Sequence, residues 1–340
     1  MAEPPAHSIS NRLGRTVLDA LPPGVRRRVR RAAGRPGPRV VPLGSLDAEL
    51  DVAAELFSGS EDAALAFLEG LVVEPPELPP PDPFSEPYHR WTWSLYSAIS
   101  GRPSYSLGNE ASPFDFEEAL TRPFPWSTGS PTIIGEDLEA RAHVLRLLGG
   151  GLGLHPPARL VEYGPGWGNL TTDLVTTGYE VTAVEVDPRF CSLLTARSAA
   201  LVKVRSEPPA PGEVGALVVV NEDMLSFRPD RRVDAAVFYE CFHHCADHFA
   251  MLEGLHDVVR PGGPVVFAGE PVHPMPYPWG PRLDGLSVWS MRRYGWLKLG
   301  FDPAYFRQAL SRTGWVMERH RLRRSAPKAE IVVARPSAAS

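Results

Sequence analysis

Short apolar runs alternate with amphipathic stretches from residue 135 onwards. The runs predict strands over 158–161, 181–185, 217–220, 234–239 and 264–268. Apolar residues at helical spacing predict helices over 136–148, 169–175, 188–201, 247–260 and 303–311. Two last runs, 315–322 and 331–334, are so close in sequence that at least one of these strands must be antiparallel. This rhythm predicts an α/β fold with a mostly parallel sheet covered on both faces.

The preceding segment has a different pattern. Apolar positions predict two short helices over 46–57 and 61–72, with Ser60 as the N-cap of the second. A proline-rich linker, 75–83, leads to a segment rich in aromatic residues, 84–131. We interpret residues 46–134 as a helical, aromatic-rich N-terminal cap that packs its own core and can also act as a lid over a pocket.

Composition places the chain among ordinary globular proteins. Of its 340 residues, 43% are hydrophobic and 22% are charged. No apolar run reaches the roughly 20 residues that span a bilayer, and the first residues lack the pattern of a signal peptide. The 3 cysteines do not form a disulfide framework, which suits a reducing compartment. We therefore expect a cytoplasmic protein, and the abundance of proline, alanine and arginine suggests the GC-rich coding sequence of a bacterium.

Charge is segregated along the N-terminal part. Residues 1–45 form a basic arm, predicted to be flexible, in which arginines cluster at Arg26, Arg27, Arg28, Arg30, Arg31, Arg35 and Arg39. Residues 40–89 carry many carboxylates and neither lysine nor arginine. The arm could tether nucleic acid or anionic lipid, but we favour a solvated arm. The net charge of −5 argues against a nucleic-acid binder.

A glycine turn joins the strand at 158–161 to the helix at 169–175. It reads Gly164-Pro165-Gly166-Trp167-Gly168, and Glu162 precedes its first glycine by two positions. A turn with few Cβ atoms lets a ligand approach the backbone, and the start of the following helix offers free N–H groups. The turn therefore predicts the floor of a nucleotide-type cofactor site.

Four carboxylates follow successive predicted strands, at the edge where open α/β sheets bind ligands. They are Glu162, Glu185, Asp223 and Glu240. Glu185 lies roughly 20 residues after the glycines, the distance at which a carboxylate meets ribose hydroxyls. Asp223 is placed to accept a hydrogen bond from an exocyclic amine. A nicotinamide-dependent oxidoreductase is the alternative, but its G-x-G-x-x-G pattern would need glycine where Asn169 stands.

Glu162-x-Gly164-x-Gly166-x-Gly168 resembles the first motif of class I S-adenosylmethionine (SAM)-dependent methyltransferases. Later landmarks fit the same family, at 184–187, 221–224, 239–244 and 260–263. The resemblance covers about residues 136–335, so we expect residues 135–340 to form the SAM-binding domain. It implies a doubly wound, mostly parallel seven-stranded sheet with an antiparallel last strand.

The resemblance also implies roles for individual residues. The glycine turn, with Pro165, would pass under the methionine portion of SAM, and Glu162 would lie near its amino group. Glu185, followed by Val186, would hold the ribose hydroxyls. Asp223 would accept from the adenine amine, with Met224 against the ring, and Tyr239 would line the sulfonium side. The product would be S-adenosylhomocysteine (SAH).

Methyl transfer to a hydroxyl needs alignment and a base, and histidine suits the base near neutral pH. His243 and His244 follow the fourth strand. We predict His244 as the base, His243 as the second candidate and Glu240 as the orienting group or alternative base. The competing interpretation is that the pair only packs near the cofactor. A divalent metal at 243–248 with Glu270 and His273 is a weaker alternative, and we predict no metal.

The acceptor is the least constrained part of the prediction. The aromatic segment 84–131 and a second aromatic insertion, 274–300, suit a sugar, a glycolipid head group or a natural product. They resemble bacterial methyltransferases found beside glycosyltransferases, so we expect a small-molecule hydroxyl. Three alternatives are a nucleic-acid methyltransferase tethered by the arginine arm, a non-catalytic SAM-binding protein, and a transferase of another part of SAM. The run Tyr239-Glu240-Cys241-Phe242 does not match the signature of base aminomethylation, which argues against the first.

Overall fold

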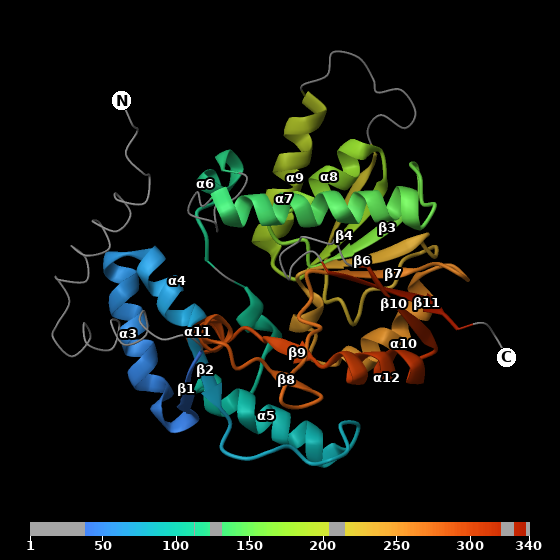
Figure 1. Cartoon of the computed structure of the whole chain (residues 1–340). Coiled ribbons are helices and arrows are strands. Elements are labelled where there is room, and N and C mark those ends of the chain that lie inside the picture. The colour runs from blue at the N-terminus through green and yellow to red at the C-terminus, as the bar shows by residue number, and fades with distance from the viewer. Residues whose placement is uncertain (1–37, 112, 123–130, 204–214, 321–329, 338–340) are drawn as a thin grey trace, which may run out of the picture. The chain divides into compact units, whose positions relative to one another are not determined.

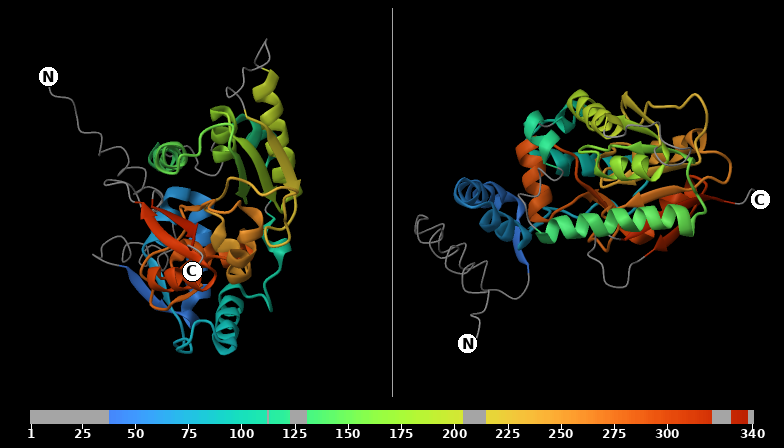
Figure 2. Two further views of the ribbon diagram at one scale, coloured as in Figure 1. Left: turned by 90° about the vertical axis from the view of Figure 1, so that its right-hand side faces the viewer. Right: turned by 90° about the horizontal axis from the view of Figure 1, so that it is seen from above.

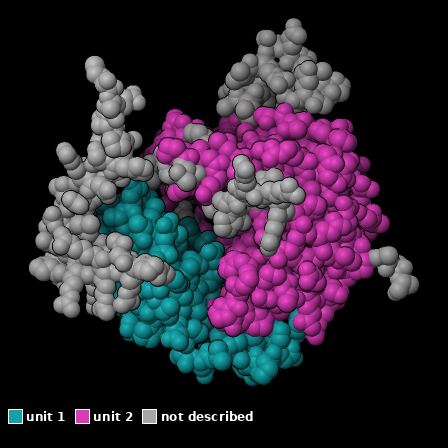
Figure 3. All heavy atoms as spheres, viewed as in Figure 1, with its two compact units in different colours: residues 1–105, 280–298 teal, residues 106–279, 299–340 magenta. Residues whose placement is uncertain are grey.

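The computed structural model describes residues 38–111, 113–122, 131–203, 215–320 and 330–337 (Figure 1). Residues 1–37, which hold most of the predicted basic arm, lie outside the described residues. The chain forms two compact units, one of residues 1–105 and 280–298 and one of residues 106–279 and 299–340 (Figure 3). Residues 280–298, the middle part of the second aromatic insertion (274–300), therefore belong to the same unit as the N-terminal helices. Two short strands, β8 (Trp279–Pro281) and β9 (Leu299–Phe301), include the points where the chain passes between units.

The first unit is mainly helical. Its helices are α3 (Leu46–Gly59), α4 (Glu61–Glu69), α5 (Glu86–Ser100) and α11 (Gly285–Tyr294). The Ser60 hydroxyl accepts the N–H of Ala63 at 3.3 Å, which confirms the predicted N-cap of α4.

A small parallel sheet in this unit differs from the predictions. Strands β1 (Arg39–Pro42) and β2 (Leu71–Glu74) pair with each other. The predicted helix 61–72 is therefore wrong after Glu69, because Leu71 and Val72 pair with a strand far away in sequence. Arg39, counted as part of the arm, forms an ion pair with buried Glu49 and covers the ring of Phe67.

The second unit contains the predicted seven-stranded sheet. Its strands are β3 (Arg159–Tyr163), β4 (Glu180–Glu185), β5 (Leu217–Asn221), β6 (Ala235–Tyr239), β7 (Val265–Ala268), β10 (Trp315–His320) and β11 (Ile331–Pro336). Their order is β10-β11-β7-β6-β3-β4-β5, and β11 is antiparallel to both of its neighbours while the other neighbouring pairs are parallel. The predicted mostly parallel sheet with an antiparallel last strand is confirmed.

Helices cover the two faces of this sheet. On one side lie α7 (Pro131–Arg146), α8 (Asn169–Thr177) and α9 (Pro188–Lys203), and on the other lie α10 (His248–Val258) and α12 (Pro303–Arg312) (Figure 1 and Figure 2). Asp247 and Asp302 cap α10 and α12 through their side chains, at 2.9 and 2.8 Å. These caps begin both helices where the sequence places their first turns.

The two faces have different cores because alternate strand residues point to opposite sides. The face toward α7 and α8 is aliphatic, with Leu160, Val181, Val237 and Val266 buried among the helix side chains. The opposite face is aromatic. Phe238 stacks on Tyr163 at 4.8 Å and on Phe267 at 5.1 Å, and Phe306 of α12 packs edge-on against Phe267. Such a rigid sheet fixes the loops at its carboxyl edge.

Two short elements of the second unit precede the sheet in sequence. The single-turn helix η2 (Leu107–Glu110) and the helix α6 (Phe116–Thr121) come from the segment predicted as a lid. No helix among the described residues is both long and apolar enough to cross a membrane.

Candidate functional site

The glycine turn lies between β3 and α8, as predicted, and all three glycines have positive φ values of 57°, 50° and 73°. A Cβ on Gly164 would lie 2.7 Å from that of Cys241, and a Cβ on Gly168 would lie 2.2 Å from Leu194. A Cβ on Gly166 would meet nothing within 4 Å among the described residues. Packing therefore requires the outer two glycines, whereas the middle one faces open space that a ligand can fill.

Glu162 lies in β3, two residues before the first glycine of the turn. Its side chain is buried, and its Oε2 has no hydrogen-bond partner among the described residues. Burial raises the pKa of Glu162 to about 7. The Thr171 hydroxyl favours the ionised form of Glu162, and the ammonium of SAM stays the predicted partner of this carboxylate.

Glu185 ends β4 beside the same turn. Its carboxylate accepts the N–H of Gly166 at 3.1 Å and the N–H of Asp187 at 2.9 Å. Burial raises the pKa of Glu185, although these two donors favour the ionised form. The structure thus brings Glu185 to the glycine turn, as the spacing in the sequence predicts.

The residues predicted for the adenine end follow β5. The carbonyl of Asp223 accepts the N–H groups of Ser226 and Phe227 at 3.1 and 3.0 Å, which folds residues 223–227 into a compact turn. Asp223 and Met224 are half-buried in this turn, as are Pro165 and Val186 in theirs. All four remain predicted contacts with the cofactor.

Tyr239, predicted on the sulfonium side, belongs to a buried network that sequence reasoning did not find. Its hydroxyl donates to Asp137 Oδ1 at 2.8 Å, and Asp137 Oδ2 accepts from Arg141 Nε at 2.7 Å. Arg141 also pairs with Asp173 of α8. Burial raises the pKa of Tyr239, so the hydroxyl keeps its proton and donates. Asp137 and Arg141 are four residues apart on a helix, and this spacing is the feature of the sequence that could have predicted their ion pair.

Both predicted histidines are held by carboxylates. His243 Nδ1 lies 2.8 Å from Glu270 Oε2, and His244 Nδ1 lies 2.6 Å from Glu110 Oε2. A carboxylate at Nδ1 selects the tautomer with its proton there and leaves Nε2 as the basic nitrogen. The side chain of His244 is 19% exposed and that of His243 only 6%, so His244 is the more accessible base.

Two carboxylates outside the predicted set contact the histidine rings, namely Glu270 and Glu110. The role of Glu240 as the orienting group or alternative base stays a prediction. Glu270 follows β7, so the strand-end rule that found Glu162 could have found it. Glu110 lies 134 residues before His244, and no local pattern connects them.

Glu270 also shapes the loop that carries the histidines. Its Oε1 accepts the N–H groups of Cys241 and Phe242 at 2.7 and 2.8 Å, and its Oε2 accepts that of His243 at 3.1 Å. Burial raises the pKa of Glu270 to about 7. One carboxylate thus fixes three backbone N–H groups and one imidazole.

Glu240 has a strained backbone. Its φ of 54° lies in the left-handed region, which costs a non-glycine residue about 1–3 kcal/mol. Its side chain passes over Gly269, where a Cβ would lie 2.6 Å from Glu240 Cγ. Strain of this kind concentrates at functional sites, which is consistent with a role for Glu240 beside Tyr239.

An aromatic cluster covers the outer side of the glycine turn. Phe114 packs against Trp167 at 5.0 Å and Phe190 at 4.7 Å. The guanidinium of Arg197 in α9 donates to the carbonyls of Trp167 and Ala119, so one side chain joins the turn to α6. These contacts link residues 113–122 to the glycine turn.

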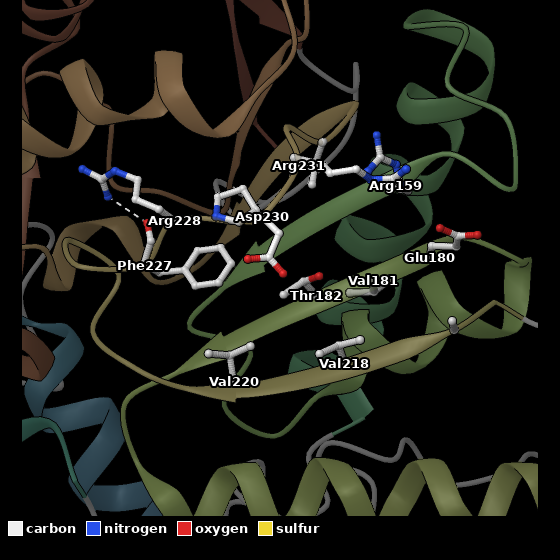
Figure 4. Close-up of a pocket in the computed structure, with 13 residues that line it drawn as sticks. Arg159, Glu180, Val181, Thr182, Val218, Val220, Phe227, Arg228, Asp230 and Arg231 are labelled. Atoms are coloured by element: carbon white, nitrogen blue, oxygen red, sulfur yellow. Dashed lines mark hydrogen bonds between the residues drawn. The ribbon is translucent and has the colours of Figure 1, made fainter.

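A separate pocket of about 370 Å³ opens on the same sheet. Residues 222–234 connect β5 to β6 without a helix, so Val218 stays 56% exposed there. Arg159, Glu180 and Ala216 place the pocket at the amino ends of the strands (Figure 4). Ligands of open α/β sheets bind at the carboxyl ends, so this pocket is not the cofactor site.

The described residues contain no group of three or more histidine, cysteine, aspartate or glutamate side chains that could hold a metal ion. Glu270, considered as a metal ligand from the sequence, is occupied by the loop N–H groups and by His243. His273 is exposed, and its Nδ1 lies 3.2 Å from the carbonyl of Pro274.

Residues 161–267 match the family model described as a methyltransferase domain. This range runs from β3 to β7 and includes the glycine turn, Glu162, Glu185 and both histidines. Residues 161–267 of the chain thus form a methyltransferase domain. Its cofactor is SAM, and the residues around Gly166 fit that assignment through the open space, the buried unpaired oxygen of Glu162 and the carboxylate of Glu185.

Curated relatives share only part of their length with the methyltransferase chain. Ribosomal RNA small subunit methyltransferase A of Mycobacterium sp. (strain KMS) is 33% identical over 95 residues, which cover 28% of this chain and 30% of that protein. The protein of the same name in Mycobacterium tuberculosis (strain ATCC 25177 / H37Ra) is 36% identical over 95 residues, which cover 28% of this chain and 27% of that protein. The chain thus spans less than a third of the length of these relatives.

Solved structures of methyltransferases are also similar to the chain. Magnesium protoporphyrin IX methyltransferase from Synechocystis PCC 6803 with bound SAH has 14% identity and a TM-score of 0.45, covering 65% of this chain and 94% of that chain. The 1,6-didemethyltoxoflavin-N1-methyltransferase of Burkholderia thailandensis has 20% identity and a TM-score of 0.42. The match covers 69% of this chain and 95% of that chain.

Proposed function

We propose that the chain transfers the methyl group of SAM to a hydroxyl of a small molecule, such as a sugar, a glycan precursor or a natural product, and releases SAH. The single observation that carries this proposal is the His244–Glu110 pair at the carboxyl edge of the sheet. A hydroxyl is a poor nucleophile until it loses its proton, so its methylation is faster when a base can accept that proton. A carboxylate-held imidazole is therefore most useful for a hydroxyl acceptor.

The predicted cofactor residues have complementary roles in this proposal. The glycine turn would pass under the methionine portion, with the ammonium near Glu162. Glu185 would hold the ribose hydroxyls, and Asp223 and Met224 would hold the adenine. Tyr239, whose hydroxyl donates to Asp137, would line the sulfonium side. Bound SAM supplies a methyl group on a positively charged sulfur, which is a good leaving group.

His244 removes the acceptor's proton in the same proposal. As the acceptor oxygen forms its bond to the methyl carbon, the carbon–sulfur bond breaks and the sulfur keeps its electron pair. The hydroxyl proton passes to Nε2 of His244, and the carboxylate of Glu110 stabilises the imidazolium that forms. His243, held more deeply by Glu270, is the second candidate, and Glu240 borders the same loop.

An RNA acceptor is the second candidate function. It is favoured by the ribosomal RNA methyltransferases among the curated relatives and by the arginines of residues 1–39. The short shared segment and the net charge of −5 support a small molecule instead. We also propose a cytoplasmic location, because the described cysteines are free thiols that suit a reducing compartment.

The test measures SAH release by the full chain from SAM with methyl glycosides, nucleotide sugars, phenols and ribosomal RNA as separate acceptors. With the active acceptor, His244→Ala should lower kcat about a hundred- to ten-thousandfold, and the loss of rate toward acid pH should disappear. Glu110→Gln should lower kcat less than His244→Ala does. It should also move the fall in rate on the acid side of the pH profile to lower pH, because a neutral amide no longer stabilises the imidazolium.

His273→Ala is the matched control, since it removes an exposed histidine of the same unit and should leave kcat unchanged. An unchanged pH profile in both His244→Ala and Glu110→Gln would remove the base assignment. Methylation of ribosomal RNA alone would replace the small-molecule acceptor, and an absence of turnover with every acceptor would favour a SAM-binding protein. A product that carries another part of SAM would show a different transferase.

A further inference from the structure

A groove in the first unit has the chemistry of a sugar-binding surface. It has a volume of about 720 Å³ and lies along α5 and the chain that follows it. Its lining comprises an aromatic pair, three serines, one proline and one arginine, namely Trp93, Tyr105, Ser94, Ser97, Ser104, Pro103 and Arg90. Arg90, Trp93 and Ser97 recur at helical spacing, so one face of α5 forms the wall.

The aromatic rings of the groove are arranged as a platform. Trp93 and Tyr105 have nearly parallel rings, with an interplanar angle of 20° and centroids 6.1 Å apart. Tyr96 packs edge-on against both from below, at 6.1 and 5.9 Å. Tyr96 is completely buried, whereas Trp93 and Tyr105 are half-buried and line the groove. The buried ring of Tyr96 supports the platform, and the rings of Trp93 and Tyr105 line the groove.

Hydrogen bonds within the unit fix the platform in advance. The Tyr96 hydroxyl donates to the carbonyl of Gly295 at 2.6 Å. Arg102 donates to the carbonyls of Met291 and Arg292, both at 3.3 Å, and Ser97 donates to that of Pro103 at 3.2 Å. The segment that carries Tyr105 is thus tied to α5 and to the end of α11. A preorganised site loses less entropy when a ligand binds.

The polar groups around the platform determine the class of ligand. Serine hydroxyls donate and accept, and a guanidinium donates in a plane, which suits hydroxyl-rich ligands. Among the described residues, the lining contains no carboxylate and one cation, Arg90, which lies 3.2 Å from Glu86. Single-stranded nucleic acid also stacks on aromatic rings, but it needs a positively charged groove, which a single ion-paired arginine does not provide.

We propose that this groove binds a saccharide. One face of a β-hexopyranoside carries axial C–H bonds, which would lie on the Trp93 ring, while the sugar hydroxyls would bond the serines and Arg90. The proposal goes beyond the proposed methyl transfer because it concerns a binding site built within the first unit alone. It is tested without SAM, so its failure and the failure of the proposed function are distinguishable.

The test is saturation-transfer NMR on the full chain with methyl β-D-glucopyranoside and cellobiose as probes. Wild type should transfer saturation to the ring C–H protons of the sugar. Trp93→Ala should weaken binding roughly five- to tenfold, the loss of one stacking contact, and Trp93→Phe should recover part of it. Ser94→Leu should block the groove without removing any packed side chain, because Ser94 is exposed.

Trp289→Ala is the matched control. It removes another half-buried tryptophan of the same unit, which stacks on Phe57 at 4.9 Å outside the groove, and it should bind like wild type. The proposal is overturned if wild type binds neither probe, or if Ser94→Leu binds as wild type does. Stronger binding of oligothymidylate than of either sugar would overturn it in favour of nucleic acid.

Discussion

Glu162 is the residue whose ionisation should change most when SAM binds. Burial raises its pKa from 4.5 to about 7, so without SAM it is largely protonated below neutral pH. In the unfolded chain it is ionised above pH 4.5, so this group's contribution to folding stability falls as pH rises through that window. The predicted ammonium partner favours the carboxylate, so binding should release a proton below about pH 7.

The SAM dissociation constant should therefore fall as pH rises from 6 to 7, by up to about tenfold per unit, and level off at higher pH. Calorimetry in buffers of different ionisation enthalpy counts the released proton. Glu162→Gln should bind more weakly with no such slope, and Glu180→Gln, an exposed glutamate of the same sheet, should behave as wild type. If the SAM dissociation constant of Glu162→Gln still fell as pH rose from 6 to 7, Glu162 would not be the group that releases the proton.

At the scale of an element, the loop after β6 depends on one carboxylate. Glu270→Ala would leave three buried N–H groups and His243 without their acceptor, which should cost about 3 kcal/mol in the free energy of unfolding at pH 5.5. The penalty should be smaller at pH 8. Because burial raises the pKa of Glu270 to about 7, wild type itself loses stability as pH rises from about 4.5 to 7.

Urea unfolding at the two pH values measures both quantities. Glu253→Ala, on the exposed side of α10, should stay within about 0.5 kcal/mol of wild type at each pH. A penalty for Glu270→Ala that grows with pH would show that burial does not dominate at this site.

Elements with a local signal were predictable from the sequence. The strand–helix alternation, the cap Asp302 and the position of the glycine turn depend on neighbouring residues, and the structure agrees with them. Strand β2 was mistaken for helix because its partner, β1, is distant in sequence, and the pairing overrides the local helical pattern. Tyr239 and Asp137 are 102 residues apart, so only the fold brings them together.

At the scale of the whole molecule, each unit is assembled from segments that are separated in sequence. Residues 280–298 leave the methyltransferase sheet after β7 and join residues 1–105 in the first unit. The aromatic character of that insertion predicts a surface for a sugar or similar acceptor. In the structure, Trp289 is half-buried and stacks on Phe57 of the first unit. Aromatic composition alone does not distinguish a ligand surface from a core.

The central claim is that the glycine turn and the strand-end carboxylates bind SAM. Calorimetric titration of the full chain with SAM and SAH tests it most directly. Wild type should bind both, and Glu185→Ala should weaken binding at least about a hundredfold through the loss of two charge-assisted hydrogen bonds to the ribose. Glu180→Ala, at the other end of β4, should bind like wild type. Binding of neither ligand by wild type, or equal binding by a folded Glu185→Ala, would contradict the claim.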